Sequence, residues 1–150
     1  MINVETSSII NRPIEEVFAF LTDARNSPQW DSGLVDIQQT PQSPVGVGTR
    51  ITEVRKFLGR KMETTSEVVE YEPSTKYTRK GTGGPFPVTG SLTFEPMAEG
   101  TKVIWTFEMK PGGFFALAEP LVTRSLKRQL EAGLGDVKDM LESRVATATS

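Results

Sequence analysis

The chain has 150 residues, of which 37% are hydrophobic and 24% are charged, and its formal net charge is −2. This composition is typical of a single globular domain, and it offers no basic excess for binding nucleic acid or an anionic membrane. The sequence contains neither cysteine nor histidine, which excludes disulfides, thiol nucleophiles, Ser-His-Asp triads and metal sites built on Cys or His ligands.

The sequence also lacks the signals of export and membrane insertion. No segment approaches the roughly 18 consecutive apolar residues that a membrane-spanning helix requires. The opening "MINVETSSII" has no charged region followed by a long apolar run, so we do not expect it to be a signal peptide. We therefore expect a cytoplasmic protein without metal or cofactor, made of one domain over residues 1–144 and a short tail over 145–150.

The N-terminal elements are a strand and a short helix. The β-branched segment 2–10 predicts a strand, and Pro13 suits the first turn of a helix. Apolar residues then recur at helical spacing on one face; they are Ile14, Val17, Phe18 and Leu21. Trp30 follows in a polar stretch, "ARNSPQWD". It is either a structural plug beneath this helix or a residue at the rim of a cavity.

Strand signals fill the middle of the chain, from residue 34 to residue 109. The segments "LVDIQQT", "TRITEVRKF", "RKMETTSEVVEY" and "KYTRKGTG" are separated by Gly- and Pro-rich turns. The next two, "VTGSLTFEP" and "TKVIWTFEM", alternate between apolar and polar residues. Alternation of this kind predicts an antiparallel sheet with one buried face.

The C-terminal segment predicts a long helix. Its apolar stripe has steps of three and four residues; the stripe is Leu126, Leu130, Leu134, Val137 and Leu141. Residues 114–119 form a separate turn, or else the helix begins near Pro120. Gly133 and Gly135 each cost about 1 kcal/mol in mid-helix, which close packing or room for a ligand would offset.

This element order predicts an α+β fold. A single sheet cannot bury its apolar face by itself, and only the C-terminal helix is long enough to cover it. We therefore expect a strongly curved antiparallel sheet of about seven strands wrapped around that helix, with one or two short helices after the first strand.

The chain resembles the START-like superfamily with the helix-grip fold, and within it the polyketide cyclase/dehydrase-like proteins. The matching segments are "INRPIEEVFAFLTD" followed by Trp30, "VVEYEPSTKY", "EGTKVIWTFEM" and "LAEPLVTRSLKRQLEAGLGDVKDMLE". The resemblance implies a cavity between sheet and helix. Members bind lipids, sterols, hormones, quinones or polyketide intermediates, some catalyse cyclisation or dehydration, and one branch stimulates a chaperone ATPase. They share no catalytic motif, so the resemblance assigns no catalytic residue.

The candidate ligand-binding residues are large side chains of the strands, Trp30 and Phe86 in loops, and two residues of the long helix. Each is either core packing or part of an apolar pocket. Phe86 lies in "KGTGGPFPVTG", which is a hairpin connection or a mobile flap. Arg124 lies on a solvated helix face or holds an acidic or phenolic ligand group. The full set is Trp30, Phe57, Tyr71, Tyr77, Phe86, Phe94, Trp105, Phe107, Met109, Leu121 and Arg124.

Three charged strand residues are candidates for catalysis: Glu53, Glu67 and Arg79. If Val69 and Tyr71 face inward, strand parity turns Glu67 inward, and an inward Tyr77 likewise carries Arg79 with it. Desolvation would raise the pKa of an inward glutamate, which could then act as an acid or base without histidine. The alternative is that these charges lie on the solvent face of the sheet.

Three functional hypotheses follow. The first is a binding protein, monomer or homodimer, for a hydrophobic or aromatic ligand such as a lipid, quinone or polyketide-like molecule. The second is a cofactor-free cyclase or dehydratase that uses a cavity carboxylate. The third is a partner-binding module, which predicts a closed interior and an exposed patch.

Overall fold

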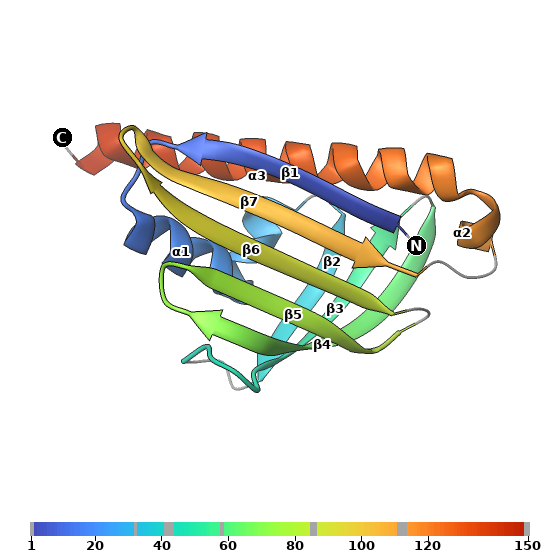
Figure 1. Ribbon diagram of the computed structural model, residues 1–150. Helices are drawn as coiled ribbons and strands as arrows, with labels where there is room; N and C mark the ends of the chain where they lie inside the picture. The colour runs from blue at the N-terminus through green and yellow to red at the C-terminus, as the bar shows by residue number, and fades with distance from the viewer. Residues whose placement is uncertain are drawn as a thin grey trace.

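The computed structural model describes residues 2–31, 33–40, 44–57, 59–84, 87–110 and 114–148, with the side chains at 57, 114, 115 and 144–148 excepted. It shows a curved antiparallel sheet of seven strands that wraps around one long helix (Figure 1). The predicted α+β helix-grip fold is confirmed. The long helix lies along the sheet's concave side, and α1 closes one end of the grip.

The first strand and two short helices precede the rest of the sheet. They are β1 (Ile2–Ile10), α1 (Ile14–Thr22) and a 3-10 helix, η1 (Ala24–Gln29). The other strands are β2 (Leu34–Thr40), β3 (Arg50–Phe57), β4 (Arg60–Glu72), β5 (Lys76–Gly83), β6 (Val88–Met97) and β7 (Gly100–Met109). The strand order is β1-β7-β6-β5-β4-β3-β2, and every pairing is antiparallel.

Two helices end the chain: α2 (Phe114–Leu117) and α3 (Glu119–Ala148). The separate turn before the long helix therefore exists, and α3 continues past residue 144. The predicted apolar stripe of α3, from Leu126 to Leu141, is buried, and the buried Val122 extends it by one turn towards the N-terminus. It joins two apolar clusters, one around α1 and the C-terminal half of α3, and the other around the start of β1 and the N-terminal half of α3.

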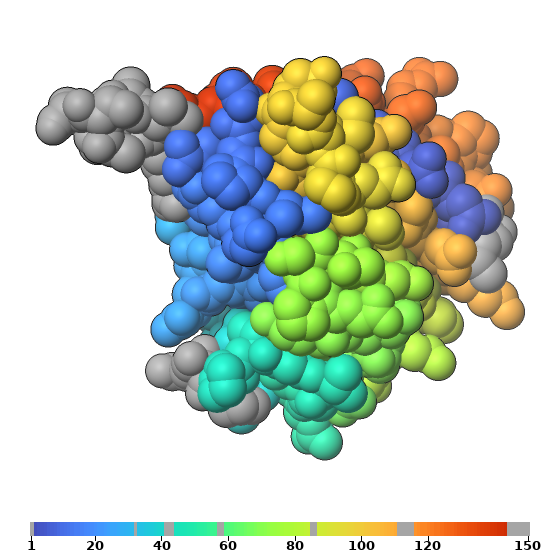
Figure 2. All heavy atoms as spheres, turned by 60° about the vertical axis from the view of Figure 1, so that its left-hand side comes forward, coloured from blue at the N-terminus to red at the C-terminus, as the bar shows by residue number. Residues whose placement is uncertain are grey.

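The junction between β1 and the β6–β7 hairpin is tightly packed. The hairpin turn lies directly against the segment that leaves β1 (Figure 2). A Cβ atom on Gly100 would lie 2.2 Å from the carbonyl oxygen of Ile10, and Gly100 has φ of +135°. The buried Thr101 hydroxyl donates to the carbonyl oxygen of Arg12 at 2.9 Å. Only glycine fits this approach of two backbones.

A β-bulge in β4 sets which of its residues face inward. Val68 pairs with Arg79, but the next paired residue is Glu70 opposite Thr78, so Val69 is an extra residue. Val68 is 0% exposed, whereas Val69 is 39% exposed. The bulge lets Val68 and Tyr71 both face inward although three positions separate them. The parity argument that grouped Val69 with Tyr71 is therefore wrong.

Candidate ligand cavity between the sheet and α3

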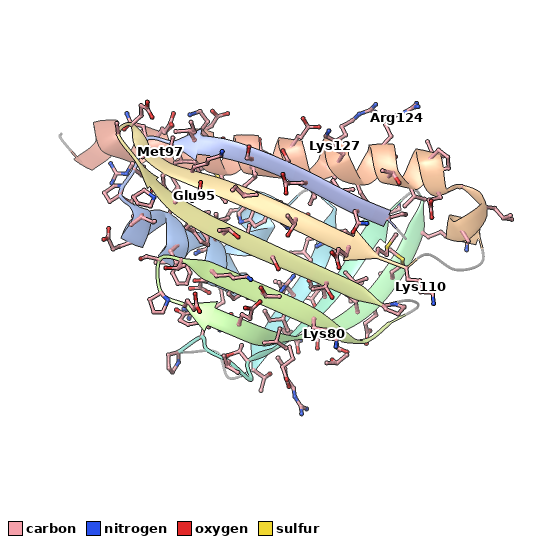
Figure 3. All side chains as sticks on the ribbon, in the orientation of Figure 1. Lys80, Glu95, Met97, Lys110, Arg124 and Lys127 are labelled. Carbon is pink, nitrogen blue, oxygen red and sulfur yellow. The ribbon has the colours of Figure 1, made fainter. Side chains whose placement is uncertain are left out.

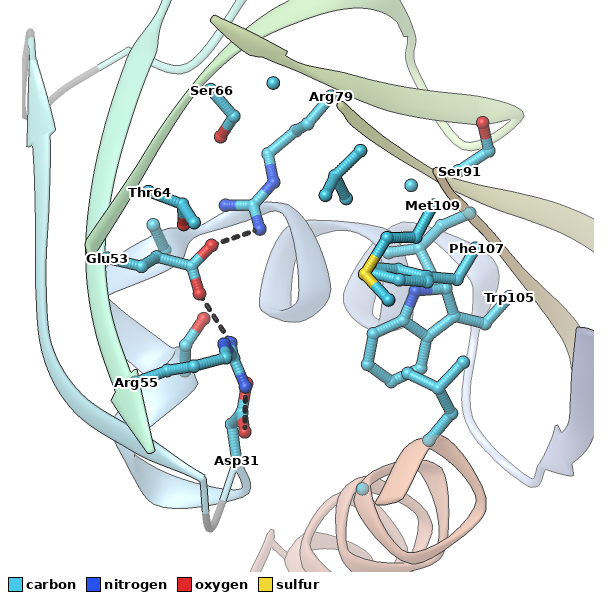
Figure 4. A pocket seen from close by; sticks show the side chains of 18 of the residues that line it. Asp31, Glu53, Arg55, Thr64, Ser66, Arg79, Ser91, Trp105, Phe107 and Met109 are labelled. Atoms are coloured by element: carbon cyan, nitrogen blue, oxygen red, sulfur yellow. Dashed lines mark hydrogen bonds and ion pairs between the residues drawn. The ribbon is translucent and has the colours of Figure 1, made fainter. Parts of the chain in front are cut away.

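A cavity of about 180 Å³ lies between the sheet and α3. This is more than ten times the roughly 10–15 Å³ that one water molecule requires on the same scale. Its two walls differ in chemistry, as Figure 4 shows. Glu53, Arg55 and Arg79 extend from β3 and β5 on one side, and Trp105, Phe107 and Met109 extend from β7 on the other.

The polar wall is a continuous chain of four charged side chains. Arg55 donates to both carboxylate oxygens of Asp31, Nη1 at 3.1 Å and Nη2 at 2.8 Å. Its Nη2 also donates to Oε2 of Glu53 at 2.5 Å. Arg79 Nη2 donates to the other oxygen, Oε1 of Glu53, at 2.7 Å. Two guanidinium groups thus face two carboxylates, and a buried charge that is paired in this way avoids most of its desolvation penalty.

Both arginines shift the acid–base behaviour of Glu53. Burial alone would raise the pKa of its carboxyl, but Arg79 and Arg55 outweigh burial and lower that pKa to about 2. The expected rise in pKa is therefore wrong, because the carboxylate has two cationic partners rather than an apolar pocket. Burial raises the pKa of Tyr77, so its hydroxyl keeps its proton at neutral pH. Glu53 is an anion throughout the physiological range, and Tyr77 is a neutral donor.

This arrangement predicts an acid-sensitive contribution to stability. The folded pKa of Glu53 lies below the unfolded value, so its contribution is complete above about pH 4.5 and is lost as pH falls towards about 2. The expected loss is on the order of 3 kcal/mol. Urea unfolding across this pH range measures it, with Glu53→Gln as the reference. If the wild type and the variant lose stability in parallel, Glu53 is not the group that titrates.

The apolar wall is organised around two tryptophans. The rings of Trp30 and Trp105 meet edge to face, with centroids 5.6 Å apart and an interplanar angle of 78°. A Cβ atom on Gly133 of α3 would lie 3.2 Å from Cε3 and Cζ3 of Trp30. The mid-helix glycine therefore makes room for Trp30 to pack on α3. No atom lies within 4 Å of a Cβ built on Gly135, so that glycine has no comparable packing role among the described residues.

Two buried donors at the cavity have no hydrogen-bond partner among the described residues. They are Nε1 of Trp30 and Oγ of Ser66, and both side chains line the cavity. An unpaired buried polar group costs about 1–3 kcal/mol. The indole nitrogen can only donate, and a serine hydroxyl can donate as well as accept. Both atoms are covered by neighbouring protein atoms, so neither is exposed in the cavity itself.

The structure places the aromatic candidates and Met109 in two groups. The first group lines the cavity and consists of Trp30, Tyr77, Trp105, Phe107 and Met109.

Tyr71 and Phe94 instead pack edge to face against Phe18 of α1, with centroids 5.3 and 5.0 Å apart. They are core residues at the α1 end of the grip. Trp30 combines both of the roles considered for it, because it packs against the core and also borders the cavity.

Of the three charged candidates, Glu53 and Arg79 line the cavity, but Glu67 does not. Glu67 pairs with Arg50 across β3 and β4, its carboxylate is 4.0 Å from the Arg50 guanidinium, and its side chain is 38% exposed. It therefore lies on the outer face of the sheet. The bulge at Val69 is the reason, because it reverses the parity between Glu67 and Tyr71.

The two candidates on α3 also lie outside the cavity. Leu121 is 51% exposed, and Arg124 is exposed and points away from the sheet (Figure 3). The buried stripe of α3 passes through Val122 and Leu126, which leaves positions 121 and 124 on the solvent side of the helix. The side chain of Phe57 and the whole of Phe86 lie outside the described residues, so the flap prediction stays a prediction.

Sequence reasoning missed several residues of the site. Arg55 is not among the predicted site residues, although it lies two positions after Glu53 in β3 and strand alternation places both on one face. Asp31 had no signal at all, because it follows Trp30 in a loop without periodicity. Gln129 and Leu130 line the cavity from α3, and the apolar stripe could have identified Leu130. Gly133 also lines the cavity, and its position in mid-helix was the signal that indicated close packing or room for a ligand.

Among the described residues, no group of three Asp or Glu side chains could hold a metal ion. No described helix combines the length and apolar character needed to cross a membrane.

A curved antiparallel sheet that grips a long helix, with a cavity between them, defines a START-like helix-grip protein. The chain belongs to the family described as "Polyketide cyclase / dehydrase and lipid transport", whose sequence profile matches residues 1–142. No curated protein sequence matches the chain significantly.

Solved structures support the fold. A protein from Thermus thermophilus is 23% identical over 99% of both chains, with a TM-score of 0.81. The Zhui aromatase/cyclase from Streptomyces sp. R1128 is 16% identical over 95% of this chain and 94% of its own, with a TM-score of 0.78. A polyketide cyclase-like protein from Corynebacterium glutamicum is 25% identical over 95% of this chain and 93% of its own, with a TM-score of 0.60.

Proposed function

We propose that this protein binds a small-to-medium aromatic, quinone-like or polyketide-like molecule in the cavity between the sheet and α3. The observation that carries the proposal is the division of the cavity into a charged, hydrogen-bonding wall and an aromatic wall (Figure 4). Small-molecule sites are commonly apolar with a few convergent polar groups. A ligand with a ring body and oxygen atoms along one edge would match both walls. The cavity also argues against the partner-binding hypothesis, which requires a closed interior.

A cavity-filling variant tests this proposal. Gly90 of β6 lines the cavity and lies between Arg79 on β5 and Phe107 on β7 in the sheet. Its nearest neighbour is Phe107, at 3.9 Å from a Cβ atom, so Gly90→Leu fits the sheet but occupies the cavity. We expect it to weaken binding at least about tenfold, which corresponds to about 1.4 kcal/mol, without loss of folding.

The measurement is a screen of lipids, quinones and aromatic polyketides by native mass spectrometry and thermal shift, followed by titration of the best ligand. Thr89→Leu is the matched control, because Thr89 is the neighbouring residue and does not line the cavity. If no ligand class binds the wild type, or if Gly90→Leu binds as well as Thr89→Leu, the proposed function is refuted. If only simple lipids bind, the ligand class is refuted.

A second candidate function is cyclisation or dehydration of a bound polyketone. It is favoured by one observation, the presence of Arg79 and a protonated Tyr77 side by side on the cavity wall. Both could donate hydrogen bonds to a carbonyl oxygen as it gains negative charge. Glu53 is unsuited to be the acid, because its pKa is about 2. A loss of product formation from a polyketone in Arg79→Met that exceeds the variant's loss of polyketone binding would support this second function.

A further inference from the structure

The chain of four charged side chains along the polar wall is electrically balanced. It contains two guanidinium groups, of Arg55 and Arg79, and two carboxylates, of Asp31 and Glu53. Glu53 contacts both arginines and links the whole chain. Although this wall contains two arginines, it is therefore not a site of net positive charge.

Arg79 nevertheless remains available to a ligand. A guanidinium carries five N–H donors, and Arg79 directs Nη2 to Glu53. Its side chain is 27% accessible. Because Arg79 lines the cavity, this accessible surface faces the space where a ligand would lie. Arg79 thus offers hydrogen-bond donors to a ligand. The carboxylate of Glu53 already offsets the positive charge of the Arg79 guanidinium.

The charge balance distinguishes between two kinds of ligand group. A carbonyl or hydroxyl oxygen accepts a hydrogen bond from Arg79 and leaves the balance unchanged. A carboxylate would bring a third negative charge next to Glu53, in a partly desolvated space where like charges repel strongly. Glu53 cannot relieve this repulsion by taking up a proton near neutral pH, because two arginines stabilise its anion.

We propose that the cavity selects uncharged ligands that present a carbonyl or hydroxyl oxygen to Arg79, and that Glu53 makes it reject carboxylates of the same shape. This inference rests on the proposed function, because it concerns the same cavity.

An isosteric pair of probes tests the inference: 2-naphthamide and 2-naphthoate, which differ by one neutral or charged group. We expect the wild type to bind the amide at least about tenfold more tightly at neutral pH. Glu53→Gln removes the offsetting charge and leaves a net positive wall, so the preference should shrink or reverse. Glu67→Gln makes the same chemical change on the outer face of the sheet, and it should leave the preference unchanged.

Wild-type protein alone provides a second measurement if Glu53→Gln does not fold. If only the uncharged acid binds, the apparent affinity for naphthoate should rise about tenfold for each unit that pH falls between about 7.5 and about 5.5. The affinity for naphthamide should stay constant. A flat pH profile for naphthoate would overturn the inference.

The outcomes separate the two proposals. If the wild type binds naphthoate as tightly as naphthamide, or if Glu53→Gln and Glu67→Gln behave alike, this inference is overturned while the proposed function stands. If neither probe binds, and none of the screened aromatic ligands binds either, both proposals are overturned together.

Discussion

Replacing Glu53 with alanine is expected to lower the free energy of unfolding by about 3 kcal/mol. The Glu53 side chain is 9% exposed and accepts hydrogen bonds from Arg55 and Arg79. Its removal leaves Arg79 without its carboxylate and leaves Arg55 with Asp31 alone. Breaking one partner out of a buried ion pair is strongly destabilising because the remaining charge is uncompensated. Thermal unfolding should show a Tm decrease of roughly 6–12 °C.

Glu67→Ala is the control for this prediction. It also removes a strand glutamate, but the Glu67 carboxylate is partly exposed and lies 4.0 Å from the Arg50 guanidinium. Exposed pairs of this kind contribute about 0–1 kcal/mol, so its Tm should stay close to that of the wild type. Equal losses in the two variants would mean that the charged chain inside the cavity does not stabilise the fold.

Replacing Gly100 with alanine is expected to cost about 3–4 kcal/mol or to prevent folding. Its φ of +135° is a conformation that L side chains rarely adopt, and the new Cβ would lie 2.2 Å from the carbonyl oxygen of Ile10. It would also lie 2.8 Å from Cα of Asn11 and 2.9 Å from the backbone nitrogen of Arg12. All three neighbours are backbone atoms, so no side-chain rotation can relieve the collision. Urea unfolding of the variant provides the measurement.

Gly59→Ala separates backbone strain from collision. Gly59 has φ of +78°, and no atom lies within 4 Å of a Cβ built there. This substitution should cost only the strain of a left-handed residue, about 1–2 kcal/mol. If both alanine variants lose the same stability, then the contact between β1 and the β6–β7 hairpin is not what requires glycine at position 100.

Regular patterns in the sequence predicted the fold. The alternation in β6 and β7 correctly indicated which residues face inward, including Leu92, Phe94 and Val103. The apolar stripe of α3 indicated the face that packs on the sheet. These elements follow one period throughout, so residue type and position determine the buried face.

The site was only partly predictable because it depends on departures from that period. The bulge at Val69 changes the parity of β4, and nothing in "SEVVEY" marks which residue is extra. Asp31 reaches Arg55 across 24 positions of the chain. A contact of that kind depends on how η1 is seated on the sheet, which local sequence does not encode. The low pKa of Glu53 follows from Arg79, 26 positions away in the chain, and from Arg55, two positions away, so it could not be anticipated from burial alone.

The contact between Trp30 and Trp105 at the cavity has a spectroscopic consequence. Trp30 and Trp105 are the only tryptophans in the chain, they contact each other, and both border the cavity. All indole fluorescence of the folded protein therefore originates at this one wall. A quinone or aromatic ligand that enters the cavity should quench that emission. It should also alter the near-ultraviolet circular dichroism that arises from coupling between the two rings, which makes the native chain a label-free reporter of its own occupancy.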